Sequence, residues 1–140
     1  MPVQFVLLPL FVHVIMTLCL LLWLVPLRAR DFRRGVRESD IALGQKAWSP
    51  RAQQVANCFD NQFQLPVLFY VLTILSIITR HADIIFVVLA WIFVLTRLGH
   101  AFVFVTSNSV QVRGGIYGLG ALVLVIAWII FMVRILAGLP

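Results

Sequence analysis

The sequence predicts an all-α integral membrane protein, a bundle of four transmembrane helices. The chain of 140 residues is 62% hydrophobic and only 11% charged, and its mean hydropathy of +1.04 exceeds that of water-soluble domains of this size. A helix needs roughly 20 apolar residues to cross a hydrocarbon core about 30 Å thick. Four segments meet this requirement, approximately residues 3–27, 53–79, 84–105 and 114–139.

The first apolar segment, residues 3–27, is expected to be a retained transmembrane helix. It has no basic residue before its apolar run, and it continues for about 25 residues, longer than the core of a signal peptide. Pro9 lies inside the run, where membrane helices tolerate proline because neighbouring groups satisfy the freed carbonyl. His13, with Thr17 one turn away, is expected to be a packed or hydrogen-bonded core residue.

The segment that follows, residues 28–52, is basic and predicts the topology. Because cytoplasmic loops of membrane proteins carry an excess of Lys and Arg, we expect this loop in the cytoplasm and both termini outside. The net charge of +6 is also compatible with nucleic-acid binding, but the basic residues are not interleaved with exposed aromatic residues, so we expect no nucleic-acid partner. The charged residues of the loop are Arg28, Arg30, Arg33, Arg34, Arg37, Lys46 and Arg51, with Asp31, Glu38 and Asp40.

The second segment, residues 53–79, carries polar side chains at helical spacing. Four of them stand at i, i+3, i+4 and i+7, so they form one stripe on an otherwise apolar helix. A charged group at the centre of a membrane helix costs roughly 2.5–3.5 kcal/mol, so the stripe indicates either a binding site or a structural polar seam between helices. Its members are Asn57, Asp60, Asn61 and Gln64.

The two cysteines, Cys19 and Cys58, both lie within apolar segments. Their positions provide neither a disulfide framework nor a metal-binding spacing. A buried free cysteine behaves as a small apolar residue, so we expect both to be packing residues and we expect no metal site.

The third segment, residues 84–105, carries Arg97 and His100, which share a helical face at i and i+3. A short turn joins it to the second segment, so the two helices are expected to be antiparallel neighbours. At about 1.5 Å per residue, Asp60 and Arg97 lie at comparable depths, roughly 10 and 13 Å from the cytoplasmic side. We therefore predict an ion pair between Asp60 and Arg97.

The fourth segment, residues 114–139, begins with polar and small residues. Arg113 and Tyr117 stand at i and i+4 and are expected to point toward one cytoplasmic-side cavity. Each alone also fits a structural role, Arg113 as an interface charge and Tyr117 as an aromatic-belt residue. Small residues let another backbone approach closely, and here they are Gly114, Gly115, Gly118 and Gly120.

Together these side chains predict a polar pocket in the cytoplasmic half of the bundle. Guanidinium, amide, imidazole and phenol groups beside apolar helix surface suit a small anionic molecule. The pocket would be lined by Arg97, Arg113, His100, Asn57, Asn61, Gln64 and Tyr117.

Three motifs occur in a characteristic order along the chain. They are Asn57-Cys-Phe-Asp-Asn-Gln-Phe-Gln-Leu-Pro-Val-Leu-Phe-Tyr70, then Arg97-x-x-His100, then Arg113-x-x-x-Tyr117. This combination resembles the MAPEG family, the membrane-associated proteins of eicosanoid and glutathione metabolism. The resemblance covers essentially the whole chain, 1–140, as a single domain. It implies a homotrimer of four-helix subunits that binds glutathione as co-substrate between helices, in the cytoplasmic half.

The resemblance also implies roles for individual residues. The Asn-x-x-Glu motif of the family falls on Asn57-x-x-Asp60 or on Asn61-x-x-Gln64, and neither carries the glutamate. Arg113 falls on the arginine that stabilises the glutathione thiolate, and would be catalytic. Two positions depart from the synthases of the family: Phe104 stands where the best-known ones carry tyrosine, and Gly114 where some carry a hydroxyl residue. Glutathione would be bound by Asn57, Asp60, Asn61, Gln64, Arg97, His100 and Tyr117.

Three functions follow from these expectations. The leading hypothesis is a glutathione-dependent transferase or peroxidase that acts on lipophilic electrophiles or lipid hydroperoxides, inserted in a bacterial inner membrane or a comparable one. The second is a non-catalytic member of the same fold that binds a lipid or a partner protein, which Phe104 and Gly114 favour. The third, a small proton-coupled exporter, is disfavoured because the first helix has no acidic residue and carries only His13.

Overall fold

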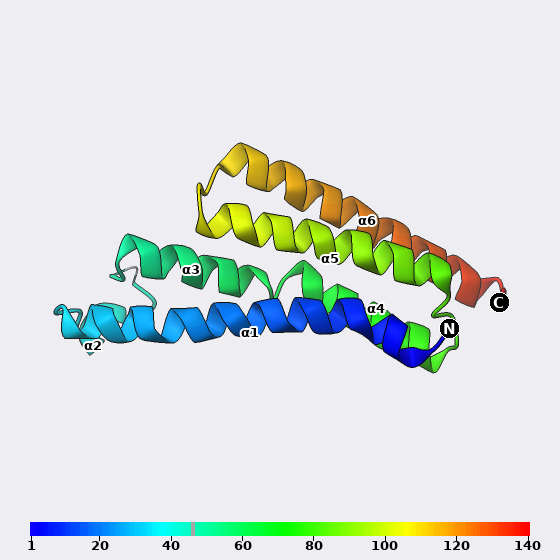
Figure 1. Cartoon of the computed structure of the whole chain (residues 1–140), viewed down its shortest axis with the longest axis horizontal. Coiled ribbons are helices and arrows are strands. Elements are labelled where there is room, and N and C mark those ends of the chain that lie inside the picture. The colour runs from blue at the N-terminus through cyan, green and yellow to red at the C-terminus, as the bar shows by residue number, and fades with distance from the viewer. Residues whose placement is uncertain (46) are drawn as a thin grey trace.

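The computed structural model describes residues 1–45 and 47–140, which form α-helices joined by short turns and loops (Figure 1). Lys46, one of the basic residues of the first loop, lies outside the described residues. Four stretches are long and apolar enough to cross a membrane, which confirms the prediction of four spanning helices. The helices are α1 (Val3–Arg33), α2 (Glu38–Ile41), α3 (Pro50–Asn61), α4 (Leu65–Ile78), α5 (Ile84–Val105) and α6 (Val110–Leu136).

The helix ends differ from the sequence-based ranges mainly on the side of the basic loop. α1 continues to Arg33 instead of ending at residue 27, and α6 begins at Val110 instead of residue 114. Hydropathy detects only the part of a helix that lies in lipid, whereas arginine-rich sequence continues a helix readily into water. The segment 28–52 is therefore largely the end of α1, the short α2 and the start of α3.

The second spanning stretch is two helices with a break between them. α3 ends at Asn61 and α4 begins at Leu65, so residues 62–64 interrupt the helix. Pro66 occupies the first turn of α4, where a backbone N–H has no helical acceptor and its loss costs nothing. The break turns the chain and places the ends of α3 and α4 beside the middle of α1 (Figure 1).

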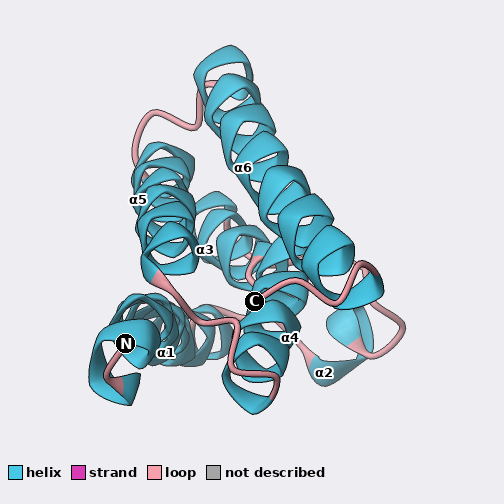
Figure 2. Cartoon of the chain, turned by 90° about the vertical axis from the view of Figure 1, so that its right-hand side faces the viewer, coloured by secondary structure: helices cyan, strands magenta, loops and turns pink. Residues whose placement is uncertain are grey.

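Apolar side chains from α1, α4, α5 and α6 form the core of the bundle. Val6 of α1, Phe69 and Leu72 of α4, and Phe93 and Val94 of α5 are almost fully buried together. α5 packs against both α1 and α6 (Figure 2), so it is the central helix. The two termini lie at one end of the bundle, and α2 and the α5–α6 turn lie at the other (Figure 1).

α5 and α6 lie in close contact at Gly120. A Cβ atom at this position would lie only 2.7 Å from Oγ1 of Thr96 on α5, so glycine permits the contact. The other three glycines of α6 meet nothing within 4 Å where a side chain would begin. Their small size is therefore not used inside this subunit.

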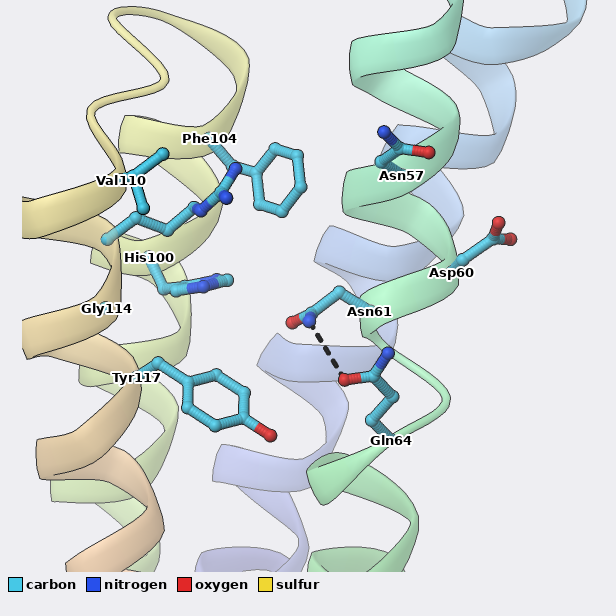
Figure 3. A pocket seen from close by; sticks show the side chains of 10 residues that line it. Asn57, Asp60, Asn61, Gln64, His100, Phe104, Val110, Gly114 and Tyr117 are labelled. Carbon is cyan, nitrogen blue, oxygen red and sulfur yellow. Dashed lines mark hydrogen bonds between the residues drawn. The ribbon is translucent and has the colours of Figure 1, made fainter. Parts of the chain in front are cut away.

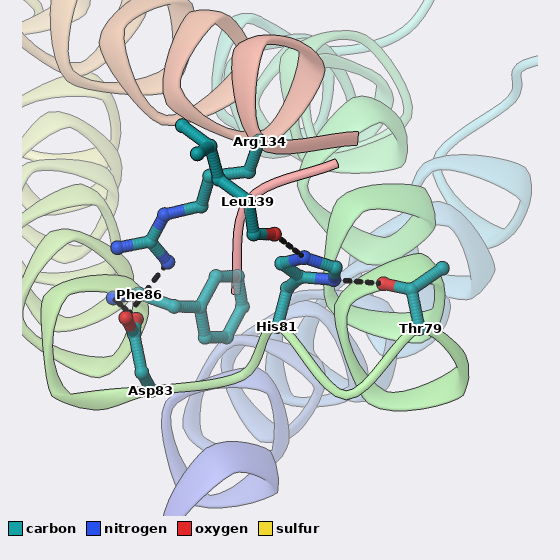
Figure 4. A network of polar contacts seen from close by, with 6 residues as sticks. All are labelled: Thr79, His81, Asp83, Phe86, Arg134 and Leu139. Carbon is teal, nitrogen blue, oxygen red and sulfur yellow. Dashed lines mark hydrogen bonds and ion pairs between the residues drawn. The ribbon is translucent and has the colours of Figure 1, made fainter. Parts of the chain in front are cut away.

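Polar contacts close the end of the bundle that carries the termini, and we call them the terminal clasp (Figure 4). Asp83 accepts a hydrogen bond from the N–H of Phe86 at 3.1 Å, which caps α5, and its other oxygen lies 2.7 Å from Nη1 of Arg134 on α6. Nε2 of His81 lies 2.9 Å from the carbonyl oxygen of Leu139. The clasp thus ties the α4–α5 turn to the end of α6.

Candidate functional site

A polar cavity of about 500 Å³ opens between α3 and the pair α5 and α6 (Figure 3). Its volume is within the range of small-molecule sites. α3 and the break provide one wall, and α5 and α6 provide the other. It lies at the end of the bundle that carries the α5–α6 turn. The lining residues are Asn57, Asp60, Asn61, Gln64, His100, Phe104, Val110, Arg113, Gly114 and Tyr117.

The structure brings seven of the eight expected site residues to this one cavity, and Arg97 is the exception. The polar residues come together because the helical spacing within each segment places them on one face of their helix. The stripe of α3 runs into the break, which carries Gln64 onto the same wall as Asn61, where their side chains form a hydrogen bond of 3.1 Å. Across the cavity, the ring of His100 on α5 lies 5.7 Å from the ring of Tyr117 on α6.

Asp60 lies at the rim of the cavity, and the predicted ion pair between Asp60 and Arg97 is wrong. The Asp60 carboxylate points away from His100 and Tyr117 (Figure 3), and in the described part of the chain it forms no ion pair. It also borders a second cavity that Arg28 lines. Comparable depth in the membrane was not sufficient to predict the pair. Each step of one residue along a helix turns the direction of the side chain by about 100° around the helix axis. The residue turned toward α5 is Asn61.

Arg97 lies directly behind the cavity wall and is 1% exposed. Its Nη2 donates to Oδ1 of Asn61 and to Oε1 of Gln62, the latter at 3.3 Å. Nε and Nη1 are buried and have no hydrogen-bond partner among the described residues. The guanidinium therefore places a positive charge beside the cavity, and its hydrogen bonds among the described residues go only to neutral amide groups, while its carbon lies 5.8 Å from the centre of the Tyr117 ring.

His100 is a second buried polar group with unused hydrogen-bonding capacity. Its side chain is 2% exposed, and Nδ1 has no partner within the described residues. Its ring packs against Phe104 at 5.7 Å between centroids. Buried polar atoms are almost always satisfied by protein, water or ligand, so Nδ1 is a candidate contact for a bound molecule.

Arg113 brings a second guanidinium to the cavity, from the first turn of α6. Its Nη1 donates to Oδ1 of Asn108 at 2.5 Å, and its guanidinium carbon lies 4.2 Å from the centre of the Phe104 ring. These two contacts hold the group in place without neutralising it. Asn108 has a positive φ of 52°, a conformation that asparagine tolerates better than most residues.

Sequence reasoning missed three contributors to this region. Asn108 holds Arg113, and Val110 lines the cavity from the start of α6. Gln62, almost fully buried, accepts from Arg97. A Ser-Asn-Ser turn before an apolar run signals a helix start, and this signal would have identified Asn108. Gln62 is off the polar stripe, and no pattern indicated it.

The site can be compared with known proteins. The model of the MAPEG family matches residues 6–133 of the chain, which include the whole cavity and most of every spanning helix. No curated protein and no solved structure matches the chain. The family comprises proteins that use glutathione, as transferases or peroxidases, and also non-catalytic members. Because the match extends over nearly the full length, this four-helix membrane protein belongs to the MAPEG family.

Proposed function

We propose that this chain is a membrane-bound, glutathione-dependent transferase or peroxidase that acts on lipophilic electrophiles. One observation carries the proposal. Arg113 lines the cavity, the buried guanidinium of Arg97 lies behind its wall, and the carboxylate of Asp60 points away from His100 and Tyr117 (Figure 3). Such a cavity has an excess of positive charge and of hydrogen-bond donors, which favours a small anion.

Glutathione fits the chemistry of this donor set. It is a tripeptide with two carboxylates, one ammonium group and one thiol, so it carries a net negative charge at neutral pH. The amides of Asn57, Asn61 and Gln64 and the phenol of Tyr117 provide neutral hydrogen bonds along both walls. Nδ1 of His100 has no hydrogen-bond partner among residues 1–45 and 47–140. The carboxylate of Asp60 at the rim would receive the ammonium group.

Arg113 is the residue to which we assign catalysis. A thiol with an ordinary pKa near 8.5 is mostly protonated at neutral pH, and a nearby cation favours the nucleophilic thiolate. Asn108 and Phe104 fix the Arg113 guanidinium at the cavity wall, so its charge is already in position when the thiol arrives. The thiol would lose its proton to water, and the thiolate sulfur would form a bond to the electrophile. The bond to the leaving oxygen or halide would break at the same time, and the leaving group would depart with its electron pair.

The lipophilic partner would arrive from the bilayer, and a second copy of the chain would complete the assembly. Of the most apolar stretches of α1 and α6, only 22% and 17% of the residues are buried within the subunit. Helices in lipid satisfy such surface either with lipid or with another protein helix. A homotrimer, as the family resemblance implies, would cover part of it. The basic segment 28–52 and the cavity would face the cytoplasm.

A non-catalytic, lipid-binding protein of the same fold is the second candidate function. Phe104 and Gly114 line the cavity and provide no hydroxyl group. An apolar cavity of about 420 Å³ also lies between α4 and α6, lined by Leu65, Leu68, Ala121, Leu124, Val125, Trp128, Ile129 and Met132. This space would hold an acyl chain whether or not the chain is an enzyme.

An ultraviolet titration with glutathione tests the proposal. The purified protein in detergent is expected to show thiolate absorbance at neutral pH, and Arg113→Ala is expected to lose it together with about 100-fold in turnover of a model electrophile. Arg30→Ala, which removes an exposed arginine far from the cavity, is the matched control and should leave both signals unchanged. If the wild type shows no binding at millimolar glutathione, the lipid-binding function replaces the enzymatic one.

A further inference from the structure

A buried polar network lies behind the cavity and joins α1, α4 and α5 to the break in the second span. Its members are Tyr70 on α4, His13 on α1, Gln62 in the break and Arg97 on α5. His13 is completely inaccessible, and Gln62 and Arg97 are each 1% exposed. Polar groups at this depth in a membrane protein are costly, so the network requires an explanation beyond packing.

The direction of each hydrogen bond follows from Gln62. Its Nε2 donates to the backbone carbonyl of Cys58 at 2.9 Å, so its Oε1 is the acceptor for both of its other contacts. Arg97 donates to that oxygen at 3.3 Å, and Nε2 of His13 lies 3.0 Å from it. His13 must therefore carry its proton on Nε2. Nδ1 is left to accept from the hydroxyl of Tyr70.

The same chain of contacts reaches the cavity wall. Because Nη2 of Arg97 donates to Oδ1 of Asn61, the NH₂ group of Asn61 is turned toward Gln64. Oε1 of Gln64 accepts that hydrogen bond at 3.1 Å (Figure 3). This hydrogen bond sets the carbonyl oxygen of Gln64 on the side of Asn61 and turns its NH₂ group away from His100 and Tyr117 (Figure 3). The orientation of the Gln64 amide at the cavity wall is thus linked to His13 through Gln62, Arg97 and Asn61.

We propose that His13 and Gln62 are positioning residues for the anion-binding cavity. They never touch the ligand. They hold the guanidinium of Arg97 against Asn61, and through Asn61 they fix the orientation of the Gln64 amide at the cavity wall. The identity of the ligand as glutathione rests on the function proposed above, whereas the positioning itself rests on the hydrogen bonds of the network.

Replacing His13 would remove the imidazole that links Tyr70 to Gln62. In His13→Leu the Oε1 of Gln62 loses a donor, and the amide is then free to rotate. Arg97 would lose one acceptor, and Asn61 would no longer be held in one orientation. A hydrogen bond of this kind contributes about a factor of ten to an equilibrium, so we expect glutathione binding to weaken roughly tenfold.

Three variants separate positioning from stability. His13→Leu removes both hydrogen bonds, and His13→Gln restores a donor that can reach Gln62, so it should recover most of the affinity. Thr73→Val is the matched control, because Thr73 is completely buried and its hydroxyl bonds only to the carbonyl of Phe69 in the same helix, at 2.9 Å. It should lower the thermal midpoint and leave the Kd for glutathione unchanged, measured by calorimetry.

A second readout does not depend on glutathione. In protein labelled with ¹⁵N-glutamine, the side-chain amide resonance of Gln64, assigned with Gln64→Asn, should move in His13→Leu and return in His13→Gln. An unchanged Kd and an unchanged resonance in folded His13→Leu would overturn the positioning role. If that variant does not fold, Tyr70→Phe applies the same test with an expected weakening of about threefold. Absence of glutathione binding by the wild type would overturn the proposed function, and the resonance would still decide the positioning.

Discussion

Arg97 is unusual because its guanidinium is buried and has no carboxylate partner in the described part of the chain. Among the described residues, the hydrogen bonds of Arg97 go only to amide oxygens of Asn61 and Gln62. Burying an unpaired charge costs several kcal/mol in most proteins, so such a residue is retained where its charge has a use. Beside a cavity, that use is to attract an anion.

Replacement of Asp60 tests this arrangement at the residue scale. Because Asp60 is exposed and forms no ion pair in the described structure, Asp60→Asn should change the thermal midpoint by less than about 2 °C. Asn61→Ala should be clearly more destabilising, by roughly 1–3 kcal/mol, because it removes an acceptor from the buried guanidinium. Thermal unfolding in detergent measures both. Equal losses of stability in the two variants would instead support an ion pair between Asp60 and Arg97.

The polar residues of the cavity could be named from the sequence, but their partners could not. Spacing on a helix gives the face of a side chain, and intramembrane polarity indicates which side chains matter. The choice between Asp60 and Asn61 as partner of Arg97 depends on the rotation of one helix against another. That rotation is set by the packing of Cys58 and Phe104 with their neighbours, which no local pattern encodes.

At the scale of single elements, the break between α3 and α4 shapes the site more than any helix does. It carries Gln62 into the core and Gln64 onto the cavity wall. The sequence contained its signal, Pro66, but proline is also tolerated inside membrane helices. Hydropathy alone predicted one continuous helix over residues 53–79 for this reason.

The terminal clasp predicts a pH dependence of stability. Partial burial raises the pKa of the Asp83 carboxyl, but the N–H of Phe86 and the guanidinium of Arg134 outweigh it and hold that pKa below its ordinary value. A carboxyl with a lowered pKa stabilises the fold above its unfolded-state pKa, and this contribution is lost as the pH falls through the folded-state pKa.

Asp83→Asn isolates that contribution, because asparagine still caps α5 but cannot pair with Arg134. Asp83 is 40% exposed, so the pair is worth at most about 1 kcal/mol, or about 3 °C in thermal midpoint. The wild type should exceed the variant by that amount near pH 6 and match it near pH 3. A constant difference between the two proteins across this range would assign the effect to something other than the ion pair.

At the scale of the whole molecule, the charge distribution predicts the orientation in the membrane. The basic segment 28–52 and the α5–α6 turn lie at one end, and both termini lie at the other (Figure 1). In a Cys19→Ala background, Ser39→Cys should be protected from a membrane-impermeant maleimide in intact spheroplasts. Ala82→Cys should be labelled. The reverse pattern would invert the topology and place the cavity on the outer side.

The four spans and their order were predictable because the bilayer imposes a length and an apolar composition on each helix. The tilt of α6 away from α3, which opens the cavity, was not predictable. It depends on how α5 and α6 pack against each other, which includes the close contact of Gly120 with Thr96.

That contact makes Gly120 the position about which α6 would tilt. The shorter part of the helix, between Gly120 and the α5–α6 turn, carries Arg113 seven residues away, about 10 Å along the axis. The longer part of α6, on the C-terminal side of Gly120, is held where Arg134 pairs with Asp83. A tilt of α6 by about 10° would move Arg113 by roughly 2 Å. The width of the cavity mouth therefore depends on the tilt of α6, and a bulkier residue at position 120 would change both.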